Sequence, residues 1–172
     1  SDREEIKRRV EEEAKKSREN LKETLREVDE RVRDSERNLK RHHEEVKKAI
    51  DDLRRSDVPR EEITKRLREL LRRSEKKIEE AMRDHDRILK EIKERADKAE
   101  RDHDDRLRKL EERGLEKRIL DDVRRLLEEL KERYRRIVDE IKKLLERLKE
   151  AYKRNLDRVR ELIERIEKEI RD

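Results

Sequence analysis

The sequence predicts an all-α protein: an elongated, nearly straight, up-down-up antiparallel three-helix bundle with helices of roughly 55 residues each. Three observations lead to this prediction. Charged residues make up 62% of the 172 residues and apolar residues only 28%, the chain has a single glycine and a single proline, and its apolar residues recur at helical spacing. Sheet-containing folds need turn residues about every 8–12 positions, so this composition argues against them.

Disorder is the first alternative, because a high charge content with few aromatic residues is also typical of disordered chains. Such chains lack a regular apolar pattern. Here the core-facing stripe of the first predicted helix starts with Ile6, Val10, Ala14, Ser17 and Leu21, which lie three or four residues apart. This spacing places the residues on one helix face. An isolated helix held by ion pairs needs no such face, so packed helices are the favoured interpretation.

The first helix is expected over about residues 2–56 and the second over about 59–113. Pro59 is the boundary signal between them, because proline suits a first helical turn, where its missing N–H would be unpaired anyway. Glu61 and Glu62 follow, and negative charge is favourable near a helix N-terminus.

The second helix is expected to end at Gly114, the only glycine. Glycine readily adopts the left-handed conformation that closes a helix C-terminus. The third helix then covers about 116–172, and all three form a single helical-bundle domain over 1–172. Short connections make consecutive helices antiparallel.

A fixed repeat of eighteen positions runs along the chain. The segment Arg83–Asp86 recurs as Arg101–Asp104, and Tyr134 recurs as Tyr152. Eighteen residues make five whole helical turns, a rise of about 27 Å, so residues one repeat apart point in the same direction. Seven-residue repeats wind helices left-handed and 11-residue repeats right-handed; this longer repeat predicts straight helices.

The repeat, the short connections and the charged residues at almost every outward position follow the rules used to design helical proteins. Over its whole length the chain resembles de novo designed, parametrically generated helical bundles with an 18-residue repeat and buried hydrogen-bond networks. The resemblance implies a coiled-coil-like structural scaffold without natural biochemical activity, and it leaves the localisation open. The chain departs from the simplest such bundles in carrying polar residues at core-facing positions.

These core-facing polar residues are the candidate functional residues. They are His42, His43, His85, His103, Ser17, Ser35, Asn20, Asn38, Ser74, Tyr134, Tyr152 and Asn155. Alignment of the helices through their connections puts three sets at common heights: His42 and His43 with Ser74 and Asn155, Asn20 with Tyr134, and Asn38 with Tyr152.

A buried polar group without a partner costs about 1–3 kcal/mol, so interhelical hydrogen bonds are expected at these heights. A polar layer is satisfied in one register only, and it would therefore specify how the helices align. Boundary residues that bind water, and a ligand site, remain as alternatives.

Neither a metal site nor a catalytic site is expected. His85 and His103 share one face but stand about 27 Å apart. The chain has one Glu-x-x-His motif, Glu100 to His103, whereas di-iron bundles use two. It has no cysteine, and no serine lies on a strained turn beside a histidine. We therefore expect no enzyme activity and no cofactor.

The charge pattern argues against nucleic-acid and membrane partners. The net charge is only +5, and acids interleave with bases, whereas nucleic-acid-binding proteins cluster Lys and Arg. No stretch approaches about 18 consecutive apolar residues, and the first residues lack the apolar segment of a signal peptide. No small-molecule substrate is expected either.

The third helix is the most apolar and carries doublets such as Leu126/Leu127 and Leu144/Leu145. The simplest interpretation is that it packs against both other helices, which favours a monomer. Alternatively, its broad face binds a further helix, from a second copy or from a designed partner. A further alternative function is a response to pH, since buried histidines gain charge below about pH 6.

Overall fold

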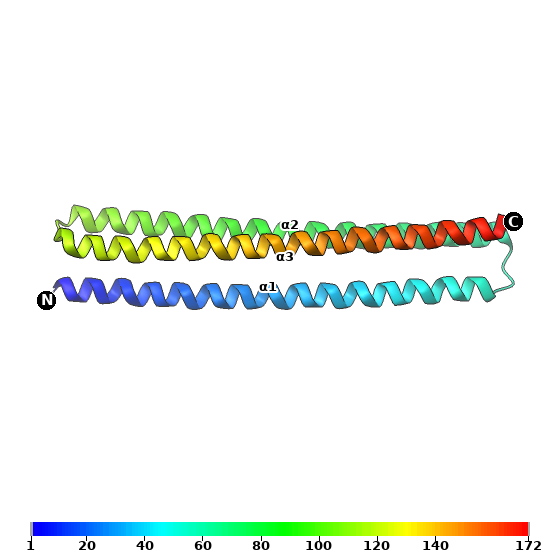
Figure 1. Ribbon diagram of the computed structural model, residues 1–172, viewed down its shortest axis with the longest axis horizontal. Coiled ribbons are helices and arrows are strands. Elements are labelled where there is room, and N and C mark those ends of the chain that lie inside the picture. The colour runs from blue at the N-terminus through cyan, green and yellow to red at the C-terminus, as the bar shows by residue number, and fades with distance from the viewer. Residues whose placement is uncertain (1, 172) are drawn as a thin grey trace. The chain divides into compact units, whose positions relative to one another are not determined.

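The computed structural model describes residues 2–171, with side chains from residue 4 onward. Three α-helices account for nearly all of this range: α1 (Asp2–Arg55), α2 (Arg60–Glu112) and α3 (Lys117–Arg171). Figure 1 colours α1 blue to cyan, α2 green and α3 yellow to red. No strand occurs within residues 2–171. The predicted all-α, three-helix fold is confirmed, and the helix ends fall within one residue of their predicted positions.

The chain divides into two compact units, each built from segments of all three helices. Unit 1 contains Ser1–Asp29 and Arg87–Lys143, and unit 2 contains Glu30–Asp86 and Leu144–Asp172. Each unit therefore holds one helix–turn–helix hairpin and one further helical segment. The organisation of 1–172 as a single domain stays a prediction.

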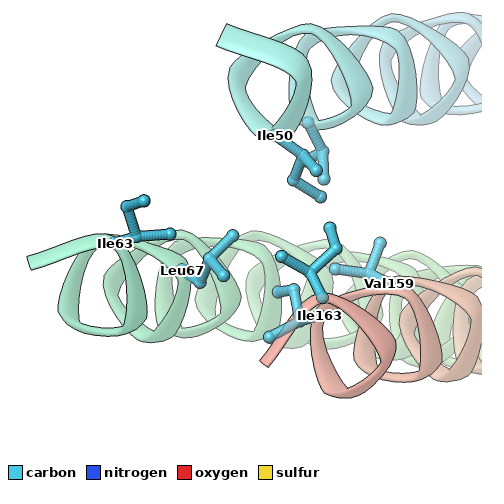
Figure 2. Close-up of a cluster of buried hydrophobic side chains, with 7 residues drawn as sticks. Ile50, Ile63, Leu67, Val159 and Ile163 are labelled. Carbon is cyan, nitrogen blue, oxygen red and sulfur yellow. The ribbon is translucent and has the colours of Figure 1, made fainter. Parts of the chain in front are cut away.

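Unit 2 has an apolar core to which every helix contributes. Ile50 of α1, Leu67 of α2 and Val159 of α3 point toward one another in Figure 2. Leu67 is completely buried, and burying one such side chain contributes about 1.5–3 kcal/mol. The cluster comprises Val46, Ile50, Ile63, Leu67, Val159, Ile163 and Ile166.

Unit 1 has an equivalent core. Its buried cluster comprises Val10, Ala14, Leu110, Val123, Leu127 and Leu130. Two ion pairs from α1 flank it: Lys7 lies 3.5 Å from Asp122 of α3, and Glu13 lies 2.8 Å from Arg106 of α2. The apolar faces predicted from helical spacing are thus the faces that each unit buries.

Ion pairs between helices show how the helices run within each unit. In unit 1, Glu111 pairs with Arg124, and Glu100 pairs with Arg135. As residue numbers fall in α2 they rise in α3, so these helices are antiparallel. Unit 2 repeats the pattern with the α2–α3 pairs Glu75–Arg160 and Arg68–Glu167.

Both helix boundaries use the residue types that the sequence indicated. Gly114 has φ +71° and donates its N–H to the Glu111 carbonyl at 3.0 Å, which is the left-handed C-terminal stop. Pro59 lies one residue before α2 rather than inside it. Its carbonyl accepts the N–H groups of Glu62 and Ile63, both at 3.0 Å, so it caps the helix as the first acceptor.

Candidate functional site

The most buried polar pair lies in unit 2, between α2 and α3. His85 and Tyr152 are each only 2% exposed. The Nε2 atom of His85 lies 3.1 Å from the Tyr152 hydroxyl, and the two rings stack with centroids 5.5 Å apart and planes at 20°. Beside them, Lys149 of α3 donates to Asp86 of α2. Polar atoms of two helices are thus paired inside an apolar core.

The surroundings of His85 favour its neutral form. Burial lowers the pKa of His85; Asp84 and Asp86 oppose this shift, while Lys149 and Arg31 reinforce it. The buried Nδ1 atom has no hydrogen-bond partner among the described residues. A second proton would therefore add a charged N–H where nothing accepts it. The neutral ring can use Nε2 with Tyr152 and leave Nδ1 as a bare acceptor.

Tyr152 is also held neutral. Burial raises the pKa of the Tyr152 hydroxyl, while a hydrogen bond with Ser35 of α1 lowers it by a smaller amount. Ser35, Tyr152 and His85 therefore bring polar atoms from all three helices of unit 2 to one place.

A second polar contact in unit 2 joins α1 to α2. The His42 Nε2 atom lies 2.9 Å from the Oγ atom of Ser74, which is completely buried. Because Ser74 donates its own proton to the Leu70 carbonyl at 3.0 Å, its oxygen must accept the proton of His42 Nε2. This fixes the tautomer of His42, whose buried Nδ1 has no partner among the described residues.

His43 and Asn155 link α1 to α3 near this contact. Burial lowers the pKa of His43, and Lys47 and Arg158 add to the shift, whereas Glu44 and a hydrogen bond with Asn155 oppose it. Burial likewise lowers the pKa of His42, with further lowering from Lys77. The four residues that the sequence placed at one height thus form two interhelical pairs.

Unit 1 contains a looser version of the His85–Tyr152 pair. His103 and Tyr134 are half-buried, with ring centroids 6.4 Å apart and planes tilted by 49°. The His103 Nε2 atom is buried and has no partner within residues 4–171. Lys131 donates to Asp104 beside it, as Lys149 does to Asp86. Burial lowers the pKa of His103, and Asp102 opposes the shift.

The remaining candidates lie outside these contacts. Ser17 is half-buried. Asn20 and Asn38, predicted to face the core, are exposed. The reason is geometric: each precedes a core-facing leucine, Leu21 or Leu39, and one residue step rotates a side chain by about 100°. Asn20 still shares a cavity lining with Tyr134 in unit 1.

Asn38 does not pair with Tyr152, because its side chain is exposed and the Tyr152 hydroxyl lies against His85. The predicted height itself agrees to within one residue with the α1–α3 ion pair Arg54–Glu169 of the same unit. The alignment through the connections used backbone positions only. Helical side chains lean toward the N-terminus of their own helix. In an antiparallel pair, both leans shift contacts toward higher residue numbers on each helix. Glu100 meets Arg135, about six residues further along α3 than the alignment predicts; the lean acts in this direction but accounts for only about one residue on each helix.

The His–Tyr pairs were missed by this alignment, although the repeat contains their signal. His85 and His103 are one repeat apart on α2, and Tyr134 and Tyr152 are one repeat apart on α3. Because α2 and α3 are antiparallel, the equal spacing of the two histidines and of the two tyrosines allows both His–Tyr pairs to form in the same register.

No protein-family model, curated protein or solved structure matches the chain. Within residues 4–171, no three or more His, Asp or Glu side chains converge in a way that could hold a metal ion. No helix in the described range has the length and apolar content needed to cross a membrane.

Proposed function

We propose that this chain is a designed structural scaffold without biochemical activity, in which buried polar side chains specify the helix register. The observation that supports this most directly is the His85–Tyr152 contact, in which two side chains that are each 2% exposed pair across α2 and α3. The His42–Ser74 contact adds a similar constraint between α1 and α2.

Register specificity follows from the different demands of apolar and polar side chains. A slip of α3 by one turn moves its residues about 5.4 Å along α2. Apolar side chains can repack after such a slip, because the new neighbours are also Leu, Ile or Val. The His85 and Tyr152 polar atoms would lose each other, at a cost of about 1–3 kcal/mol for each buried unpaired group.

The design origin is supported by the regularity of the surroundings. The pair Lys149–Asp86 recurs as Lys131–Asp104, one repeat away on both helices. Such repetition of whole contacts is typical of parametrically built bundles with coiled-coil-like packing.

Spin labels on α2 and α3 of unit 2 test the register directly. The chain contains no cysteine, so Lys65→Cys and Lys153→Cys, both at exposed positions, give a unique labelled pair about 25 Å apart along the helix axis. Electron–electron double resonance should give one narrow distance distribution. With His85→Leu and Tyr152→Phe added, a second population displaced by about 5.4 Å should appear.

Ile78→Val is the matched control, because it trims the buried face of α2 in the same unit and leaves every polar contact in place. It should keep the single distribution. If the His85→Leu/Tyr152→Phe protein also kept one unshifted distribution, register would be set by apolar packing and the turns, and the proposal would fail.

A pH-responsive bundle is the second candidate function. Burial lowers the pKa of all four histidines, so acidification favours states in which these rings reach water. Size-exclusion chromatography with light scattering at pH 7.5 and pH 5.5 tests whether the change includes association or dissociation.

The third candidate is binding of a further helix by α3. It has less support than the monomeric scaffold, because no large apolar side chain in residues 4–171 is exposed. The same light-scattering experiment distinguishes them: a single species of 21.5 kDa favours the monomer.

A further inference from the structure

Unit 1 contains a cavity between all three helices. Its volume is about 410 Å³, and its walls are Asn20, Leu21, Glu23, Thr24 and Glu27 of α1, Ile92, Arg95 and Ala96 of α2, and Tyr134, Ile137 and Val138 of α3. A neighbouring cavity of about 260 Å³ shares Ala96, Tyr134 and Val138 with it. The small side chain of Ala96 therefore lies where both cavities meet.

Two residues beside the cavity are smaller than the residues one repeat away in unit 2. In unit 2, the residue equivalent to Thr24 is His42, one repeat later in α1. The residue equivalent to Ala96 is Ile78, one repeat earlier in α2. In unit 2, the His42 ring reaches Ser74 at 2.9 Å and Ile78 is 4% exposed. Thr24 and Ala96 are therefore smaller than their counterparts in unit 2, whereas Ile92 stands where unit 2 has the smaller Ser74 and makes up part of the difference.

We propose that this cavity binds a neutral, planar bicyclic heteroaromatic molecule with a ring N–H, of the size and chemistry of indole. Pockets of about 300–1,000 Å³ with apolar walls and a few polar groups are typical small-molecule sites. Leu21, Ile92 and Ile137 supply apolar walls, and the half-buried Tyr134 ring supplies a surface for aromatic stacking.

One polar group of the cavity, the Thr24 hydroxyl, favours a ligand with an N–H donor. The Thr24 hydroxyl donates its proton to the Asn20 carbonyl at 2.9 Å, so its oxygen is left as an acceptor. A ring N–H in the cavity can donate to that oxygen. The cavity lining carries Arg95, Glu27 and Glu23, and Arg26 pairs with Glu23. These charges compensate and favour a neutral ligand, since a charged ring would lose hydration against the apolar walls.

Indole itself is the probe, and proton NMR is the measurement. The chain has no Trp or Phe and only two tyrosines, so the aromatic region is sparse, and the Tyr152→Phe variant assigns the Tyr134 signals. Titration with indole at pH 7.5 should shift the Tyr134 ring protons saturably while those of Tyr152, in unit 2, stay unchanged. Equal shifts of both tyrosines, or no saturable shift up to the solubility of indole, would overturn the proposal.

Two cavity variants test the site from different directions. Ala96→Ile should weaken indole binding about tenfold or more, because it fills the space that Ile78 fills in unit 2. Thr24→Val should weaken it about fivefold, because it removes the acceptor at almost constant volume. Ala49→Ile is the matched control: it enlarges a half-buried alanine of unit 2 and should leave binding unchanged.

Indene, which has the shape of indole without the N–H, completes the test. It should bind the original protein about fivefold more weakly than indole does, and Thr24→Val should remove this difference. Circular dichroism verifies that each variant is helical. Unchanged indole binding by a folded Ala96→Ile protein would place the ligand elsewhere, and an unchanged preference for indole in Thr24→Val would exclude the hydrogen bond.

Discussion

Tyr152 stacks on His85 and hydrogen-bonds to it, whereas Tyr134, one repeat away, tilts away from His103 and leaves the His103 Nε2 atom unpaired. The same two residue types on the same two helices thus give a closed pair in unit 2 and an open pair in unit 1. The cavity beside Tyr134 explains the difference, because it gives that ring space to tilt.

The two tyrosines should therefore differ in their contribution to stability. Tyr152→Phe leaves His85 Nε2 buried without a partner, and we expect it to lower the free energy of unfolding by about 1–3 kcal/mol. Tyr134→Phe removes no hydrogen bond to histidine, and we expect a change within about 0.5 kcal/mol. Guanidinium unfolding at pH 7.5, followed by circular dichroism, gives both values. Equal losses of unfolding free energy in the two variants would contradict the difference between the closed His85–Tyr152 pair and the open His103–Tyr134 pair.

Stability should fall on acidification from pH 8 to pH 5.5, a range above the titration of ordinary carboxylates. Burial lowers the pKa of His85 and His103, so the unfolded chain binds more protons than the folded one. The stabilisation is complete above the unfolded pKa of about 6.5 and decreases as the pH falls toward the folded pKa.

Thermal melts across this range provide the measurement. His85→Leu combined with His103→Leu should flatten the pH dependence, because two of the four histidines no longer titrate. Melting temperatures that coincide at pH 8 and pH 5.5 would show that these rings do not resist protonation.

Core packing should outweigh surface ion pairs. Leu67 is fully buried among residues of all three helices (Figure 2), so Leu67→Ala should cost about 2–5 kcal/mol. Arg160 pairs with Glu75 at 3.2 Å, but both side chains remain substantially exposed, so Arg160→Ala should cost about 0–1 kcal/mol. Chemical denaturation of both variants checks this order, and a reversed order would refute it.

The turn between α2 and α3 depends on the backbone of Gly114. Its φ is +71°, and an added Cβ would meet no atom within 4 Å. Gly114→Ala should therefore cost about 1–2 kcal/mol from the left-handed conformation alone. Gly114→Asn is the matched comparison, since asparagine tolerates this conformation better, and its loss should be smaller. If alanine and asparagine were equally harmless, backbone conformation would not limit this position.

The sequence was sufficient to predict the helices and their ends, since these depend on local chemistry. Gly114 and Pro59 mark the boundaries because each has an unusual backbone, and the spacing of apolar residues such as Leu67 identifies the buried faces. Burial of His85 was also predictable, since it lies on the same face as its apolar neighbours.

Side-chain partners were less predictable, because they depend on distances that local pattern does not contain. The alignment through the connection placed α3 about eight residues away from its observed position opposite His85, more than the lean of side chains toward helix N-termini accounts for, so the contact of His85 with Tyr152 was not predicted. Asn38 was expected to face the core, but it lies one position before the core-facing Leu39 and is exposed. The cavity at Ala96 could be recognised only after the two units were compared position by position.

The positions of the two turns have a consequence for folding kinetics. The turn at 56–59 lies in unit 2 and the turn at 113–116 lies in unit 1, so each unit contains one hairpin whose contacts are local in sequence. Lys7 and Asp122, by contrast, meet across most of the chain. Local contacts form fastest because little loop entropy is lost. Folding can therefore start independently at either turn, with each terminal segment joining a preformed hairpin last.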